Sequence, residues 1–264
     1  MQPGNPKAML AQLHRFVSDT RPPGSRCTID AHQINLAAVR LRRYGVLKIR
    51  GLLDPGAISA VGAAARDLYG ERDARVAAGE CLTAPERQSH LRRTLALDRI
   101  MAGGTPAADL LDCPAIRALA GLHLGKPPRL DPNSYVRALI PGPHIQALPF
   151  HQDQYILQTP LLNVWIPLTE CGVHAPSLEV VVTDRRDLIA VAGLPDHAVP
   201  VERARIDERL VLEMFGPGAL WRPNLSLGDM LVFAGTTIHR SHVTPQMTKP
   251  RLSVELRLVS SAPH

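Results

Sequence analysis

The chain has 264 residues, of which 45% are hydrophobic and 20% are charged. This composition is ordinary for a globular protein, and the length fits one large domain or two small ones. The formal net charge is +6, but the arginines that carry most of it are spread along the chain, and only 4% of residues are aromatic. A nucleic-acid-binding protein, which needs a clustered basic face or a stacking platform, is therefore not expected, whereas a small anionic substrate is compatible with the charge.

No apolar stretch is long enough to span a bilayer, and the amino terminus lacks the charged-then-apolar order of a signal peptide. The cysteines are scattered without zinc-like spacing, at Cys27, Cys81, Cys113 and Cys171. We therefore expect reduced and mostly buried thiols, no membrane partner and a cytoplasmic location. No pattern in the sequence indicates an oligomeric state.

The first part of the chain, residues 1–128, is predicted to be mostly helical. Residues 29–44 place apolar side chains at helical intervals, and Asp30 suits the N-cap. Residues 46–53 alternate as a half-buried strand does. Two more helices are predicted to begin with a proline in the first turn, where its missing N–H costs nothing: residues 55–69 and 114–124.

From about residue 129 onward, short apolar segments alternate with turns, and Asp229 after Gly228 indicates one such turn. Residues 184–217 are expected to be irregular and to form the mouth of a site. Helices followed by many strands predict one α+β, mainly β domain over 1–264: a double-stranded β-helix (jelly roll) core at 129–264, buttressed by the helices. The expected strands are residues 134–140, 161–168, 178–182, 231–233 and 252–259.

The most informative residues are His151 and Asp153, two positions apart, and the distant His239. On an extended strand, side chains two apart point to the same side, and His239 would arrive from another strand of a barrel. Two histidines and one carboxylate occupy one face of an octahedron and leave the other positions open, as in non-haem Fe(II) oxygenases. A His-x-Asp pattern alone is more often an incidental surface pair, so the complete ordered set carries this interpretation.

The ordered motifs resemble those of the phytanoyl-CoA dioxygenase family of Fe(II)- and 2-oxoglutarate-dependent oxygenases. The resemblance implies a dioxygenase that uses Fe(II), 2-oxoglutarate and dioxygen, with His151, Asp153 and His239 as the catalytic metal ligands. The segments that carry it are residues 42–47, 149–153, 163–168, 228–233, 239–241 and 250–253.

The resemblance also implies a cosubstrate site. Arg251 matches the arginine that clamps the distal carboxylate of 2-oxoglutarate, a task for which a planar guanidinium suits better than a lysine. Ser241 matches a hydroxyl that assists the clamp. Trp165 matches an aromatic residue beside the cosubstrate, although a tryptophan on an apolar strand is as often a core residue.

Three further residues leave alternatives open. Gln152 is a candidate for the cosubstrate site, but it faces away from its ligand neighbours if the strand is regular. Arg137 either holds a substrate or cosubstrate acid inside the barrel or faces solvent. His242 could compete with His239 for the metal; we prefer His239 because it keeps the family's distance from Arg251.

The resemblance implies hydroxylation of an unactivated C–H bond, with desaturation, epoxidation, epimerisation and ring closure as other outcomes. Asp153 stands where halogenating relatives have a small residue, so halogenation is not expected. We expect a small-molecule substrate, either a secondary-metabolism intermediate or an amino-acid-like acid. Two alternatives are a turnover-deficient protein that binds 2-oxoglutarate or another ligand, and a structural jelly roll whose histidines are incidental.

Overall fold

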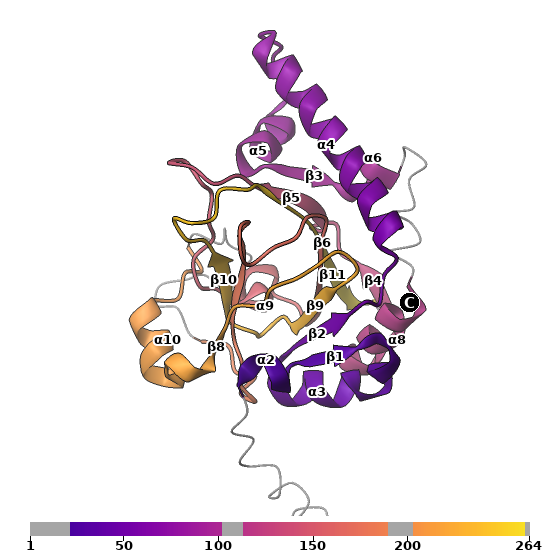
Figure 1. Ribbon diagram of the computed structural model, residues 1–264, viewed down its shortest axis with the longest axis vertical. Coiled ribbons are helices and arrows are strands. Elements are labelled where there is room, and N and C mark those ends of the chain that lie inside the picture. Colours follow the sequence, from indigo (N-terminus) through magenta and orange to yellow (C-terminus); the bar gives the residue numbers. More distant parts are fainter. Residues whose placement is uncertain (1–21, 102–112, 190–202, 262–264) are drawn as a thin grey trace, which may run out of the picture.

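The computed structural model describes residues 22–101, 113–189 and 203–261. Two β-sheets face each other at its centre, and most of the amino-terminal helices pack against the outer side of the larger sheet (Figure 1). This architecture confirms the predicted α+β fold with a jelly-roll core. Within the described residues, no helix has both the length and the apolar character needed to cross a membrane.

The larger sheet has eight strands. Except for the parallel pair β1–β2, its pairings are antiparallel. Seven strands follow the order β1 (Thr28–Asp30), β2 (Val46–Arg50), β9 (Met230–Ala234), β6 (Leu161–Pro167), β11 (Arg251–Ser260), β5 (Tyr135–Leu139) and β3 (Thr94–Ala96), and β4 (Pro128–Leu130) pairs with β11.

The smaller sheet has three antiparallel strands in the order β10 (His239–His242), β7 (Ser177–Val181) and β8 (Leu220–Trp221). An isolated bridge between His151 and His239 attaches the chain before α9 to its edge. The two sheets therefore enclose an interior that receives side chains from both, which is where a jelly roll can build a site.

The helices begin and end where the local sequence dictates. The Asp54 side chain accepts a hydrogen bond from the Ala57 amide (2.8 Å) and so caps α4, while Gly125, with a φ of 69°, ends α8. The helices are α2 (Pro23–Arg26), η1 (Ala31–Leu36), α3 (Ala37–Tyr44), α4 (Pro55–Ala77), α5 (Ala84–Arg92), α6 (Leu97–Met101), α8 (Pro114–Leu124), α9 (Asp153–Leu157), α10 (Glu208–Phe215) and η2 (Pro217–Ala219).

Several predicted elements are confirmed, and some need correction. The helix over 114–124 has the predicted bounds, and Asp229 lies in the turn before β9, where its carboxylate accepts a hydrogen bond from the Ser226 amide. The single helix predicted over 29–44 is wrong: the chain first pairs with β2 as β1 and then forms η1 and α3. Helix α4 runs on to Ala77, and α5, capped by Thr83, was not predicted.

The main hydrophobic core lies between the larger sheet and the helices, and Tyr69 of α4 is part of it. The Tyr69 hydroxyl donates to the Arg93 carbonyl (2.6 Å) and accepts from the Ala138 amide (3.2 Å), which ties α4 to the edge of the sheet. Burial raises the pKa of this phenol, so the hydroxyl keeps its proton. The cysteines are all free; Cys27 and Cys171 are buried, while Cys81 is exposed.

We expect Tyr69→Phe to lower the free energy of unfolding by about 1–2 kcal/mol, because it removes these hydrogen bonds from a buried position while keeping the ring. Urea unfolding of the metal-free protein, followed by circular dichroism, measures the change. Tyr155→Phe is the matched control, since within the described part of the chain no hydrogen bond of the Tyr155 hydroxyl is seen. Equal losses in both variants would contradict the assigned role of Tyr69.

Candidate metal centre

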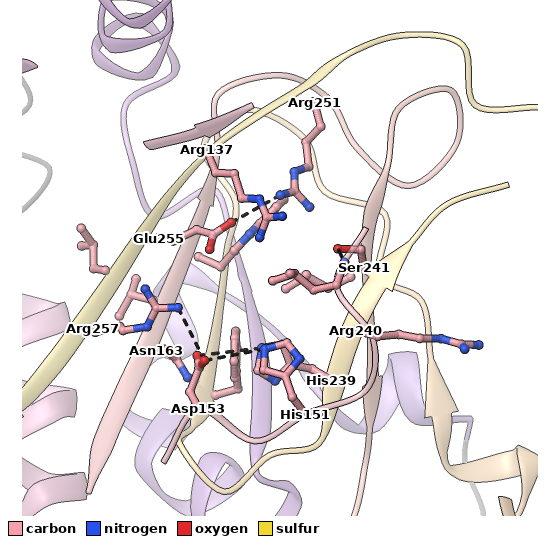
Figure 2. A pocket seen from close by; sticks show the side chains of 16 residues that line it. Arg137, His151, Asp153, Asn163, His239, Arg240, Ser241, Arg251, Glu255 and Arg257 are labelled. Carbon is pink, nitrogen blue, oxygen red and sulfur yellow. Dashed lines mark hydrogen bonds and ion pairs between the residues drawn. The ribbon is translucent and has the colours of Figure 1, made fainter. Parts of the chain in front are cut away.

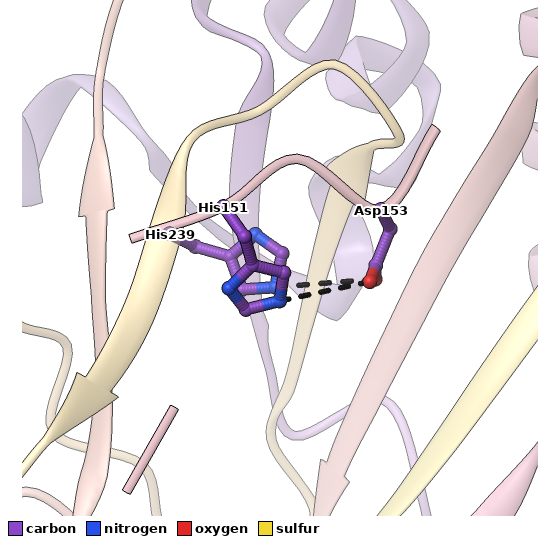
Figure 3. Close-up of side chains that lie close together, drawn as sticks. All are labelled: His151, Asp153 and His239. Carbon is purple, nitrogen blue, oxygen red and sulfur yellow. Dashed lines mark ion pairs between the residues drawn. The ribbon is translucent and has the colours of Figure 1, made fainter. Parts of the chain in front are cut away.

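The side chains of His151, Asp153 and His239 meet between the two sheets (Figure 3). One ligand atom of each lies within 4.8 Å of those of the other two. The His151 Nε2 is 3.7 Å from Oδ1 of Asp153, and the His239 Nε2 is 3.9 Å from Oδ2. All three residues are buried. Three donors this close together, shielded from water, have the composition and spacing to bind a single divalent metal ion.

Backbone hydrogen bonds fix the two histidines side by side. The His151 amide donates to the His239 carbonyl (3.0 Å), and the His239 amide donates back to the His151 carbonyl (3.1 Å). The predicted strand carrying both His151 and Asp153 is not formed: His151 makes an isolated bridge with His239, and Asp153 is the first residue of α9. Gln152 between them is extended (φ −124°, ψ 122°), and so the side chains of its two neighbours still point to the same place.

The protonation states suit metal binding. The Nδ1 atoms of His151 and His239 lie 2.7 Å and 3.0 Å from the carbonyl oxygens of Pro149 and Thr237. A carbonyl oxygen only accepts, so each Nδ1 carries the proton and each Nε2 offers a lone pair. Burial, helped by the nearby His239, lowers the pKa of His151 to about 3, which keeps that imidazole neutral.

Asp153 stays ionised despite being buried. Burial by itself would raise the pKa of this carboxyl, but the positive charge of the adjacent Arg257 lowers it to about 2. Arg257 approaches to 3.5 Å from the Asp153 Oδ1 and is itself held by the Asn133 carbonyl (2.6 Å). The guanidinium therefore orients the carboxylate as an outer partner of the candidate metal ligands.

Two predicted alternatives are placed outside this cluster. The Gln152 amide donates to the carbonyls of Asp187 (2.9 Å) and Thr236 (2.6 Å) and accepts from the Ile189 amide (2.8 Å). Its polar atoms are engaged with the backbone, and among the described residues Gln152 is not part of the lining of the pocket beside the triad. His242 is half-buried, pairs with Ser177 across β10 and β7, and does not join the metal-ligating group.

The other four predicted residues, Arg137, Trp165, Ser241 and Arg251, all line the pocket beside the triad (Figure 2). The Arg251 guanidinium is 1% exposed and lies 5.3 Å from the Trp165 ring, and its Nη2 is 3.3 Å from the Glu255 carboxylate. The Ser241 hydroxyl oxygen accepts from the Leu148 amide (3.0 Å), which leaves its proton available to donate.

Several buried donors in this pocket lack an acceptor. Among the described residues, the Nε and Nη1 of Arg251 and the Nε1 of Trp165 have no hydrogen-bond partner. A buried donor without a partner costs about 1–3 kcal/mol, and more when it is charged. The residues present therefore fit a carboxylate ligand that reaches from the triad to Arg251.

Sequence reasoning missed Glu255, Arg257 and Asn163, which also line the pocket. Alternation along β11 turns Arg251, Glu255 and Arg257 to one face, and Asn163 lies opposite Arg257 on β6. Side chains alternate between the two faces of a strand, so counting in twos from Arg251 could have predicted that Glu255 and Arg257 face the same pocket.

Two histidines and an aspartate buried together inside a jelly roll are the ligand set typical of the non-haem Fe(II) oxygenases. The phytanoyl-CoA dioxygenase (PhyH) family model matches residues 41–247. The chain belongs to this family and is an oxygenase-type enzyme. No curated protein sequence matches the chain.

Several solved structures share this fold. EctD from S. alaskensis with bound Fe has a TM-score of 0.63 at 19% identity, covering 88% of this chain and 77% of that chain. The non-heme alpha ketoglutarate dependent carbocyclase SnoK from nogalamycin biosynthesis has a TM-score of 0.60 at 18% identity over 88% and 87%. The epimerase SnoN from the same biosynthesis has a TM-score of 0.54 at 19% identity over 87% and 83%.

We expect that replacing His151, Asp153 or His239 by alanine weakens Fe(II) binding by more than about tenfold, because each supplies one of three ligand atoms. Anaerobic equilibrium dialysis with Fe(II) measures the dissociation constant. His242→Ala is the matched control, since it removes an imidazole from the same strand as His239, and it should retain the metal. Loss of iron in His242→Ala with retention in His239→Ala would contradict the ligand assignment.

Proposed function

We propose that the protein is an Fe(II)- and 2-oxoglutarate-dependent dioxygenase that hydroxylates an unactivated C–H bond of a small metabolite. The observation that carries the proposal is the buried triad next to Arg251, whose guanidinium has unpaired donors. Structures of the same fold support the choice of metal and cosubstrate: SnoN was crystallised with Fe3+, alpha ketoglutarate and nogalamycin RO, and EctD with 2-oxoglutarate and 5-hydroxyectoine.

In this proposal His151, Asp153 and His239 would hold the iron, and three ligands from the protein would allow the cosubstrate and dioxygen to reach it. Arg251 and Ser241 bind the distal carboxylate of 2-oxoglutarate, because a buried guanidinium and a hydroxyl proton are the donors that such a group needs. When bound, the iron and 2-oxoglutarate supply the oxidising power, and one dioxygen, one 2-oxoglutarate and one C–H bond give one C–OH group, succinate and carbon dioxide.

The protein's own residues orient the candidate metal ligands and exclude water from the pocket. Arg257 holds the Asp153 carboxylate in orientation, and the backbone bridge fixes both imidazoles. Trp165 is 2% exposed and closes the side of the pocket beneath the Arg251 guanidinium. Exclusion of water strengthens each of these charge-assisted contacts and suppresses side reactions.

Hydroxylation is the proposed outcome, since the intact Asp153 leaves no ligand position for a halide. The carbocyclase SnoK and the epimerase SnoN share the fold, which makes ring closure and epimerisation the main other outcomes to test. Because both come from nogalamycin biosynthesis, a secondary-metabolism intermediate is the substrate class that we favour, followed by an amino-acid-like acid.

The experiment that tests the function is an anaerobic titration of the metal-free protein with Fe(II) and then 2-oxoglutarate. We expect the weak visible absorption band of iron chelated by a 2-oxo acid, and its loss in His239→Ala. Iron binding without the band would exclude 2-oxoglutarate as the cosubstrate. The band without succinate release upon admission of dioxygen, across a panel of polar acids, would favour a turnover-deficient binding protein.

We expect Arg251→Ala to weaken 2-oxoglutarate binding to the Fe(II)-loaded protein by about 2 kcal/mol, or roughly 30-fold, because a charge-assisted pair is lost. Anaerobic calorimetric titration measures the dissociation constant, and Arg251→Lys should lie between wild type and Arg251→Ala since it keeps a point charge. An unchanged dissociation constant would move the carboxylate clamp to another residue.

We expect Glu255→Gln to strengthen 2-oxoglutarate binding, the opposite of the effect of Arg251→Ala. The Glu255 carboxylate is within 3.3 Å of the Arg251 Nη2 and so competes with the cosubstrate for that guanidinium. Removing its charge should tighten 2-oxoglutarate binding by about 1 kcal/mol, or roughly fivefold, in the same calorimetric experiment. Weaker binding in Glu255→Gln would mean that Glu255 orients Arg251 for the cosubstrate.

A further inference from the structure

A second hollow lies beside the metal pocket, between α5, β3 and β5. Arg137 and Leu148 line both hollows, so the two share a wall. Figure 2 shows the Arg137 guanidinium close to Glu255 and Arg251. Arg137 can therefore contact a molecule in either hollow.

The lining of this second hollow mixes polar and apolar side chains, and its charged residues are all positive. Its side chains include Gln88, Ser89, Thr94 and Asn133, and its two charged residues are arginines, the exposed Arg92 and the buried Arg137. No aspartate or glutamate of the described chain lines it. Such a lining suits a polar anion better than an acyl chain, since each of these groups can bind an oxyanion.

Arg137 is the residue with the clearest need for an anion. It is 4% exposed, and its Nη2 donates to the Gln146 carbonyl (2.7 Å). Within the described residues its Nε has no hydrogen-bond partner, and it forms no ion pair. Glu255, the carboxylate beside Arg137 in Figure 2, is paired with Arg251, so two buried guanidinium groups share one carboxylate and a ligand that supplies a further negative charge would bind there favourably.

The charges of the metal pocket point the same way. Arg240 also lines it but is neutralised by Glu179 and Glu208. The other charged lining residues are three arginines and two carboxylates: Arg137, Arg251, Arg257, Asp153 and Glu255. Apart from the two candidate metal-ligating histidines, this leaves one positive charge. Fe(II) adds two positive charges and 2-oxoglutarate adds two negative ones, so one positive charge remains in the loaded site.

We propose that the second hollow is the substrate subsite and that Arg137 binds an oxyanion group of the substrate, a carboxylate or a phosphate. This inference rests on the proposed function. Arg251, with Ser241 and Trp165 beside it, already supplies a clamp for 2-oxoglutarate. Arg137 lies one strand further toward the second hollow, on β5 between β11 and β3, and is the cation that both hollows share.

The test uses the full chain loaded with Mn(II), which does not turn over with dioxygen, and with saturating 2-oxoglutarate. Acetate and inorganic phosphate are the two probes, and the enhanced nuclear relaxation of each probe by the paramagnetic ion reports binding near the metal. We expect at least one probe to bind the loaded wild type, and Arg137→Gln to weaken it by about tenfold or more. Which probe binds distinguishes a carboxylate from a phosphate site.

The control variants separate the subsite from a general effect of charge or folding. Arg129→Gln removes an exposed arginine on β4 and should leave probe binding unchanged. Gln88→Trp fills the second hollow from the exposed side of α5, without touching Arg137, and should also abolish binding. This second variant keeps the test decisive if Arg137→Gln does not fold.

Three results would overturn the inference. One is that neither probe binds the loaded wild type, and another is that Arg137→Gln and Gln88→Trp bind the probes as wild type does. The third is that Arg137→Gln weakens 2-oxoglutarate as much as Arg251→Ala, which would make Arg137 a second cosubstrate clamp. A wild-type chain that binds neither Mn(II) nor 2-oxoglutarate would instead overturn the proposed function, and the subsite with it.

Discussion

The pair of backbone hydrogen bonds between His151 and His239 is the contact on which the rest of the site depends. It joins the chain just before α9 to the first residue of β10, and so places two imidazoles with ring centroids 4.2 Å apart. Because β10 continues into the smaller sheet, the same strand also delivers Ser241 to the pocket two residues later. The turn into α9 then brings Asp153 to the open side of the two rings.

Electrostatics sets the second constraint. One small space is lined by two buried arginines (Arg137 and Arg251), the partly buried Arg257 and the buried Asp153, and Glu255 is the other carboxylate in its lining. Buried charge is expensive unless paired, and the unpaired donors of Arg137 and Arg251 show that the protein alone does not pair it all. The extensive apolar core under the larger sheet offsets this cost. One face of the larger sheet thus packs against the helices and stabilises the fold, while its other face lines the pocket.

Much of this architecture could be predicted from the sequence. The apolar runs at 161–168 and 252–259 became β6 and β11, and the helix over 114–124 has its predicted bounds, because these segments combine strong periodicity with clear end signals. The set of ligand residues also came from the sequence. The helix predicted over 29–44 failed at its start, because parallel pairing of β1 with β2 overrides local helical spacing.

What the sequence could not supply is the partner of each side chain. The contact of Arg257 with Asp153 joins β11 to the start of α9, two segments far apart in the sequence, and no local pattern indicates it. Gln152 looked like a candidate for the cosubstrate site by its position between two ligands. Its amide instead bonds to backbone groups at residues 187, 189 and 236, which only the folded chain brings within reach.

That arrangement of Gln152 has a consequence for the coupling of binding to local order. The residue between two candidate metal ligands is also the anchor of residues 187–189, so the ligand geometry and the docking of this segment are one linked equilibrium. If a bound metal ion stabilises the docked state of this segment by a given free energy, docking of the segment strengthens metal binding by the same free energy. A substitution in residues 187–189 that weakens their hydrogen bonds to Gln152 would then lower the affinity for the metal, although it changes none of the candidate ligands.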